Sequence, residues 1–248
     1  MGTMMKIKLS DFKILFFCGL VLATAIPVFA FSQQPTLKVV KKMKVYRQQI
    51  KADSNYTMVE IKSSMPSLQY DLRYATAHNF TGQPLYKQGN MTFLRRPAAT
   101  ALQGVQAALN QQGLGLKIFD AYRPYSTTRK MWELIQDERY VANPAKGSGH
   151  NRGLAVDVTI IELASGKELN MGTGFDHFSD TAHHSFKNLD PSILQNRNLL
   201  KQTMEAAGFK ALETEWWHYS WPNDRAYEVL DLDFTQFSKH HIQQSQVK

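Results

Sequence analysis

The sequence predicts an α+β fold, in which a single domain has a central, mostly antiparallel sheet flanked by helices. Segments with the apolar spacing of helices are mixed with segments that have the two-residue period of β-strands. The helical segments begin near residues 97, 126 and 190, and the strand segments lie at 116–120, 153–163 and 215–221. Because their order lacks a regular strand–helix–strand rhythm, an antiparallel sheet is favoured over a parallel one. A length of 248 residues, 43% of them hydrophobic, suits one such domain.

The first helical segment starts at Pro97 and ends at Gly113, two residues typical of a helix start and a helix end. Its apolar residues lie on one face: Leu102, Val105 and Leu109. The strand that follows, 116–119, ends at Asp120. The second helical segment has Ser126 as a candidate cap and should end before Pro144. It carries the apolar residues Met131, Trp132 and Ile135.

The strand predicted at 153–163 has one apolar face, and its other face carries small and polar residues. The apolar face is formed by Leu154, Val156, Val158 and Ile160, which alternate with Ala155, Asp157 and Thr159. We therefore expect Asp157 to point away from the buried face. The third helix begins at Asp190, an N-cap residue followed by proline, and ends at Gly208. A final aromatic strand is predicted at 215–221.

Residues 1–30 have the pattern of a secretory signal peptide. Three lysines precede an apolar run from Ile14 to Val28, and Ala30 provides the small residue of a cleavage site. The alternative is an uncleaved membrane anchor, which Pro27 and the cleavage site disfavour. We predict export to the periplasm or the extracellular space, with no stable membrane insertion after processing, since no later stretch could span a bilayer.

The single cysteine, Cys18, lies inside this predicted signal, so a mature chain would have neither disulfides nor thiolate catalysis. Cleavage would remove three lysines and Asp11 and lower the formal charge from +8 to +6. The remaining Lys and Arg residues are scattered and match no zinc-finger, RNP-type or helix-turn-helix pattern, so a nucleic-acid partner is not expected. An anionic cell wall is one partner for such a chain, and simple solubility is the other explanation of its charge.

The predicted organisation has four parts. They are the signal peptide at 1–30, a basic extension at 31–66, the domain at 67–237 and a polar tail at 238–248. No internal repeat or low-complexity linker interrupts the domain.

A metal site is predicted from three residues on two segments. His150 lies in a glycine-flanked loop, Asp157 follows seven residues later on a strand, and His218 lies among tryptophans in the last strand. Each residue alone is more often structural, but two histidines and one carboxylate leave the open fourth position that a catalytic zinc needs. Glu215 lies three residues before His218. On a flat strand these two would face opposite sides, so we predict a bulge or a strand end between them.

Several sequence motifs resemble those of one enzyme family. They are SGHNRGLAVD at 148–157, EWWH at 215–218, DLRYATAHNFTG at 71–82, FDAYRP at 119–124 and MGTGFD at 171–176, followed by His183 and His184. Together they resemble the D-Ala-D-Ala dipeptidases of the vancomycin-resistance type, within the wider zinc fold shared by D,D-carboxypeptidases and hedgehog signalling domains. The resemblance covers about residues 67–222.

The resemblance implies a zinc peptidase with one Zn²⁺ per chain, on the face of the sheet. By motif, the metal ligands are His150, Asp157 and His218, the catalytic residues are Glu215 and Arg123, and the substrate-binding residues are Ser148, Asp176 and Tyr74. Glu215 would be the general base and acid, and Arg123 would stabilise the transition state. The guanidinium group suits the second role because it stays charged and offers several donors. The sequence departs from the resistance enzymes in its export signal and in a shorter stretch between Arg123 and His150.

Three functions remain open from the sequence. The first is hydrolysis of D-Ala-D-Ala or a similar D-amino-acid dipeptide, whose ammonium and carboxylate groups Asp176 and Ser148 could bind. From spacing alone, Asp176 could equally cap a turn. The second is a D,D-carboxypeptidase or endopeptidase that acts on peptidoglycan stem peptides, which would need an open groove. The third is a non-catalytic zinc module, which the presence of Glu215 and Arg123 disfavours. His183 and His184 are expected to be structural, because adjacent side chains point apart.

Overall fold

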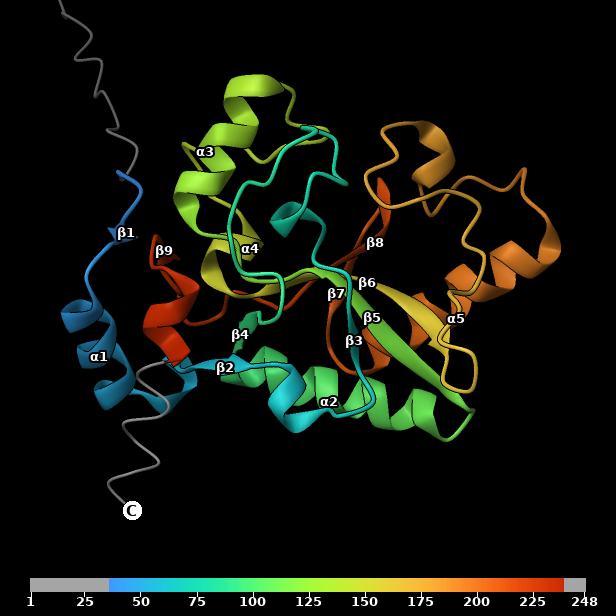
Figure 1. Ribbon diagram of the computed structural model, residues 1–248, viewed down its shortest axis with the longest axis horizontal. Coiled ribbons are helices and arrows are strands. Elements are labelled where there is room, and N and C mark those ends of the chain that lie inside the picture. Colours follow the sequence, from blue (N-terminus) through green and yellow to red (C-terminus); the bar gives the residue numbers. More distant parts are fainter. Residues whose placement is uncertain (1–35, 239–248) are drawn as a thin grey trace, which may run out of the picture. The chain divides into compact units, whose positions relative to one another are not determined.

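The computed structural model describes residues 36–238 (Figure 1). The predicted signal peptide and almost all of the predicted polar tail lie outside the described residues. The helices are α1 (Met43–Ala52), α2 (Arg96–Asn110), α3 (Tyr125–Leu134), α4 (Gly149–Arg152) and α5 (Pro191–Ala206). The strands are β1 (Val39–Val40), β2 (Met58–Glu60), β3 (Gln69–Tyr70), β4 (Phe93–Arg95), β5 (Leu114–Asp120), β6 (Ala155–Glu162), β7 (Lys210–Leu212), β8 (Glu215–Ser220) and β9 (Val229–Leu230). Across residues 36–238, no helix is long and apolar enough to cross a bilayer.

The central sheet has five strands in the order β3-β5-β6-β8-β7. Only β3 and β5 run parallel, while the other three pairings are antiparallel. Two small ribbons accompany this sheet: β2 pairs with β4 in antiparallel orientation, and β1 pairs with β9 in parallel orientation. The mixed helices and the mostly antiparallel sheet confirm the predicted α+β class.

Helices α2 and α5 contact each other and pack on the strands β5, β6 and β8. On α2 the predicted apolar face is buried, with Leu102 and Leu109 fully inaccessible. Burial of one leucine side chain is worth about 1.5–3 kcal/mol, so this face anchors the helix on the sheet. Helix α5 begins where predicted, because the Asp190 carboxylate accepts a hydrogen bond from the Ser192 amide.

Helix α3 differs from its prediction at both ends. It starts at Tyr125 after Pro124, and Ser126 does not cap it. Instead, the Ser126 amide donates to the carboxylate of Asp231, at 2.9 Å. The partner comes from a segment 105 residues away, which no local pattern can indicate. The helix ends at Leu134, one residue before Ile135, which was predicted to be helical.

Strand β6 is buried on both faces rather than on one. Asp157 is 2% exposed and Thr159 is fully buried, although both lie on the face predicted to differ from the apolar one. The reason is that other side chains, including Arg123 and Trp217, enclose the same pocket as Asp157. The face of β6 that carries Asp157 therefore lines the pocket, but it is not exposed to solvent along its length.

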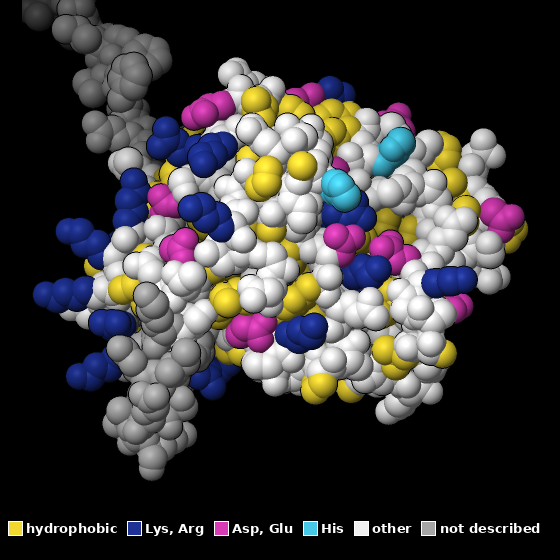
Figure 2. All heavy atoms as spheres, viewed as in Figure 1, with side chains coloured by type: hydrophobic (Ala, Val, Ile, Leu, Met, Phe, Trp, Pro, Cys, Tyr) yellow, Lys and Arg dark blue, Asp and Glu magenta, His cyan; other side chains and the backbone are white. Residues whose placement is uncertain are grey.

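Residues 37–66, which the sequence predicts as part of a basic extension, belong to the same compact unit as the predicted domain. Tyr46 of α1 is fully buried, and its hydroxyl accepts a hydrogen bond from the Met58 amide. Exposed lysines and arginines gather over α1 in Figure 2. Because they are interspersed with its apolar residues, the sequence did not indicate that one face of this helix is buried. Strand β9 also follows β8, so the aromatic strand is not the last one.

Candidate metal centre and active site

His150 lies on α4, a helix of a single turn whose two ends are both closed. At its start, Ser148 and Asn151 exchange side-chain and backbone hydrogen bonds in a capping box. At its end, Gly153 takes the left-handed conformation at φ +68°, which glycine adopts without steric cost. The side chain of Asn151 also donates to the Arg123 carbonyl oxygen at 2.9 Å. The turn is therefore fixed both within itself and to the segment that carries Arg123.

The imidazole of His150 is oriented by a backbone group. Its Nδ1 lies 2.8 Å from the carbonyl oxygen of Ala121, and a carbonyl can only accept, so Nδ1 carries the proton. The lone pair of Nε2 is then free, and it points to His218 Nδ1 at 3.2 Å and to Asp157 Oδ2 at 3.4 Å. A hydrogen bond of this kind to the second ring nitrogen is typical of metal-binding histidines.

His218 and Asp157 complete the cluster from neighbouring strands. They are partners in the antiparallel register of β6 and β8, and His218 Nδ1 lies 2.9 Å from Asp157 Oδ1. The other ring nitrogen of His218 contacts Ser220 Oγ at 3.1 Å. The ligand atoms of all three residues lie within 4.8 Å of one another. The predicted trio is therefore brought together on the face of the sheet.

The three donors suit a zinc ion. Atoms bound at about 2.0–2.2 Å in a tetrahedral arrangement are separated by about 3.3–3.6 Å, close to the distances from His150 Nε2 to the other two ligands. Burial alone would raise the pKa of Asp157, but the contacts with His150 and His218 hold it below its ordinary value. Two imidazole nitrogens and a carboxylate that converge at one buried place could be satisfied together by a cation.

The predicted break between Glu215 and His218 is confirmed as a bulge. Ala211 of β7 is opposite Tyr219, whereas the next residue, Leu212, is opposite Glu215. The intervening residues of β8 therefore have no partner on β7. Because the strand bends there, Glu215 and His218 line the same pocket despite their odd spacing.

Glu215 lies beside the metal ligands without completing their set. Its Oε2 is 3.9 Å from His218 Nδ1, and 15% of its side chain is exposed. Burial raises the pKa of Glu215 to about 7. A carboxyl group with a pKa near neutrality can take up and release a proton in the same reaction cycle.

Arg123 is held in place from two sides. Its Nε donates to Asp120 Oδ2 at 2.9 Å, and its Nη2 lies 2.8 Å from the same oxygen. The guanidinium also stacks over the ring of Tyr74, with its central carbon 4.7 Å from the ring centre. Nη2 is 3.9 Å from Asp157 Oδ2, so this fixed cation reaches the edge of the metal cluster.

Asp176 and Tyr74 form a second acidic point in the pocket. The Tyr74 hydroxyl donates to the carboxylate of Asp176, at 3.0 Å to Oδ1. Asp176 has φ +57°, an uncommon conformation for a residue other than glycine. Burial, and after it the charge of Asp157, raises the pKa of Asp176 well above its ordinary value. A positively charged ligand group beside Asp176 would lower this pKa and so favour the carboxylate form.

All eight residues predicted from the sequence line one pocket of about 190 Å³. The predicted residues are Tyr74, Arg123, Ser148, His150, Asp157, Asp176, Glu215 and His218. The rest of the wall is formed by Phe80, Met131, Glu138, Arg139, Tyr140, Val141, Ala142, Gly149, Leu212 and Trp217. The hydroxyl oxygen of Ser148 accepts from the Asn151 amide at 3.1 Å, and its hydrogen can still serve a ligand.

Two supporting residues were not identified in the sequence. Asp120 is fully buried, and it accepts hydrogen bonds from Arg123 and from the Tyr86 hydroxyl, the latter at 2.9 Å. The position of Asp120 at the end of a buried strand, three residues before Arg123, was an available signal. Tyr86 lies in an irregular segment, and its role depends on a contact 34 residues away.

Comparison with known proteins places the chain in a family. The model of peptidase family M15, described as D-ala-D-ala dipeptidase, matches residues 53–240. The D-alanyl-D-alanine dipeptidase of Escherichia coli (strain K12) is 35% identical over 180 residues, which cover 73% of this chain and 92% of that protein. The enzyme of the same name from Enterococcus faecalis (strain ATCC 700802 / V583) is 32% identical over 171 residues, with coverages of 61% and 85%.

Among solved structures, VanYB in complex with D-Alanine-D-Alanine aligns over 57% of this chain and 78% of its own, with 17% identity and a TM-score of 0.37. The match of the family model over most of the chain and the identity to the E. coli protein agree with the motifs and with the clustered zinc ligands. This chain belongs to the D-Ala-D-Ala dipeptidase family of zinc metallopeptidases.

Proposed function

We propose that this chain hydrolyses D-Ala-D-Ala, or a closely similar D-amino-acid dipeptide, to free amino acids in a zinc-dependent reaction. One observation carries the proposal. A pocket of about 190 Å³ contains the metal ligands, the carboxyl group of Glu215 and the Asp176–Tyr74 pair. Pockets for drug-sized ligands measure about 300–1,000 Å³, so this volume favours a very small substrate over a polymer.

The residues divide the reaction among them. His150, Asp157 and His218 would hold the zinc, which would supply Lewis-acid activation of the scissile carbonyl and of the attacking water. Glu215 removes a proton from that water and delivers it to the leaving amine. Arg123 stabilises the negative charge that develops on the carbonyl oxygen, since Asp120 and Tyr74 already fix its guanidinium.

The substrate of a dipeptidase is a zwitterion, and the pocket has groups for both of its ends. Asp176 offers a half-buried carboxyl group to the ammonium group, and the Ser148 hydroxyl can donate to the substrate carboxylate. A peptidoglycan stem peptide has no free ammonium at the corresponding place. The acidic end of the pocket therefore supports the dipeptide rather than the carboxypeptidase alternative.

The proposal is tested by comparing two substrates with purified, zinc-loaded protein. Free D-Ala-D-Ala should be cleaved with the higher kcat/KM, and a tripeptide with an acylated amino terminus should be cleaved poorly. A clear preference for the acylated tripeptide would establish the carboxypeptidase function instead.

Asp176→Asn should lower kcat/KM for D-Ala-D-Ala by about 10- to 100-fold, because a hydrogen bond to a charged group contributes about 1.5–3 kcal/mol. The amide oxygen can still accept from Tyr74, so the fold should be retained. Hydrolysis of the acylated peptide, however slow, should not change. Steady-state kinetics on both substrates check this, and equal losses on both would contradict the role of Asp176 in binding the ammonium.

We also propose that the protein acts outside the cytoplasmic membrane, on dipeptides or wall-derived fragments in the cell envelope. The support comes from the lysines and the apolar run of residues 1–30 and from the basic charge of the remaining chain. Cleavage after Ala30 should give a mature protein that begins at Phe31. Amino-terminal sequencing of the protein from fractionated cells checks this, and recovery of Met1 from the cytosol would contradict it.

A further inference from the structure

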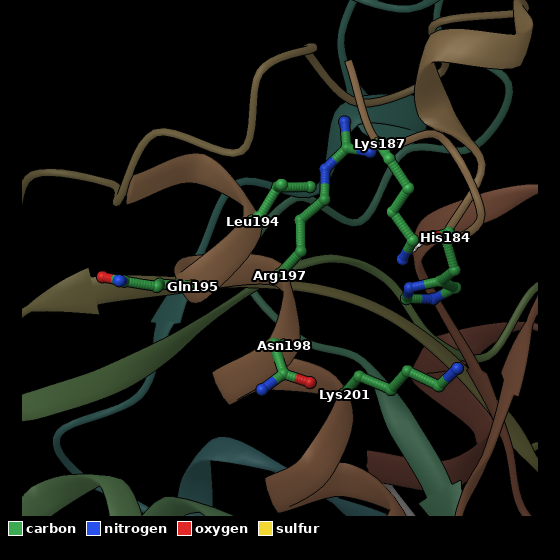
Figure 3. Close-up of a pocket in the computed structure, with 7 residues that line it drawn as sticks. All are labelled: His184, Lys187, Leu194, Gln195, Arg197, Asn198 and Lys201. Carbon is green, nitrogen blue, oxygen red and sulfur yellow. Dashed lines mark hydrogen bonds between the residues drawn. The ribbon is translucent and has the colours of Figure 1, made fainter. Parts of the chain in front are cut away.

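A second pocket, of about 390 Å³, lies between α5 and the segment that precedes this helix. Seven residues line it: His184, Lys187, Leu194, Gln195, Arg197, Asn198 and Lys201 (Figure 3). Three of these are cations, and none is an acid. None of the seven lines the active-site pocket, so this cavity is separate from the metal centre.

Arg197 is a buried cation whose hydrogen-bond partners are all neutral. Only 4% of this residue is exposed. Its Nε donates to the Met171 carbonyl at 2.7 Å, its Nη2 to Thr181 at 2.9 Å and its Nη1 to His183 at 3.2 Å. Backbone carbonyls satisfy the donors but do not neutralise the charge, and burial lowers the pKa of Arg197.

The two lysines add to the positive charge of the pocket, and the charge of Lys201 is felt by the nearby acid Glu213, whose pKa it lowers after other causes. Lys187 Nζ donates to the His184 carbonyl at 3.1 Å, and Figure 3 shows its amine beside the His184 ring. Within residues 36–238, no ion pair joins Lys187, Arg197 or Lys201 to a carboxylate. The neighbouring acid Glu213 accepts from the Ser185 amide and does not line the pocket.

His184 contributes a polar atom that lacks a partner. Its Nε2 is buried, and no hydrogen bond to it is found in the described part of the chain. Burial, and after it the charge of Lys201, lowers the pKa of His184 to about 4. The ring is therefore neutral near pH 7 and can present one N–H group to a ligand.

We propose that this pocket binds a compact oxyanion of the phosphate class. Three cations around a concave surface produce a positive potential that attracts multivalent anions, and lysine and arginine are the usual phosphate donors. The shared chemistry is a phosphate group, which can come from free inorganic phosphate or from a polyol-phosphate polymer. This inference does not depend on the proposed dipeptidase function.

Binding at this place would also stabilise the segment that carries Asp176. The three carbonyls bound by Arg197 belong to residues 171, 181 and 183, on both sides of Asp176. An anion beside Arg197 would offset the cost of burying this charge in the folded state, in which the three contacts are made, without touching the metal centre. Phosphate should therefore raise the melting temperature of the zinc-loaded protein.

The test is calorimetric titration of the zinc-loaded chain with inorganic phosphate. The wild-type protein should bind it, and Lys187→Gln/Lys201→Gln should weaken the affinity about tenfold or more, as expected when hydrogen bonds to charged groups are lost. The control Lys44→Gln/Lys51→Gln removes the same charge from exposed positions on α1 and should change nothing. A separate titration with a glycerol-phosphate oligomer identifies the source, since tighter binding of the oligomer indicates a polymer ligand.

Equal affinity in the wild-type protein and the Lys187/Lys201 variant would overturn the proposal, because any remaining phosphate would then be bound elsewhere, for example at the metal centre. A second measurement does not depend on the folding of the variant. Phosphate should shift the ring resonances of His184 in the wild-type protein, and a spectrum in which only His150 and His218 respond would also overturn the proposal.

Discussion

Glu215→Gln is expected to keep about one zinc per chain and to lose about 10²-fold or more of its turnover, the usual scale for a positioned general base. Glutamine preserves size and polarity but cannot accept the proton. The carboxylate of Glu215 is 3.9 Å from His218 Nδ1, outside the group of ligand atoms that converge, so the metal should not depend on it. Metal analysis and kcat on D-Ala-D-Ala measure the two effects separately.

A matched control is Glu133→Gln, which removes the same charge from an exposed position on α3. It should retain both zinc and activity. The assignment would be reversed if Glu215→Gln lost its zinc while Asp157→Asn retained it.

Replacement of either histidine ligand should remove the metal and abolish activity. His150→Ala or His218→Ala leaves two ligands, which are too few to hold a catalytic zinc tightly. Removing His218 also takes away the partner at 2.9 Å from Asp157, a carboxylate that is only 2% exposed. Added zinc should therefore fail to restore the activity of these variants, whereas it should restore wild-type protein treated with a chelator.

His183→Ala provides the control for histidine loss. His183 lies near Asp180, at 3.7 Å, and is not part of the metal cluster. This variant should keep its zinc. Wild-type metal content in both His150→Ala and His218→Ala, or full activity in metal-free protein, would show that the metal site was wrongly assigned.

The parts of the fold that could be predicted depend on local patterns. The apolar face of α2, the cap at Asp190 and the bulge in β8 all follow from the spacing of a few neighbouring residues. The parts that could not be predicted depend on contacts between distant segments. Asp231 accepts a hydrogen bond from the Ser126 amide in the first turn of α3. The burial of Tyr46 on α1 likewise depends on packing against distant segments, and the many lysines of this stretch gave no sign of it.

The same distinction applies to the site. The three zinc ligands could be predicted because their residue types and order are specific. The hydrogen bonds that orient them could not, since the partner of His150 Nδ1 is the backbone carbonyl of Ala121, an atom that every residue has. The role of Asp120 could have been predicted from its place three residues before Arg123. Its contact with Tyr86, 34 residues away, could not.

The pairing of β1 with β9 has a consequence for the order in which the protein folds. Val39 is opposite Val229, so synthesis must reach at least residue 229 before the ribbon can form. Contacts between residues so distant in sequence are slow to form because a long loop must close first. Nascent chains that end before residue 229 should therefore leave β1 without its partner, and the first described strand should be among the last to become protected.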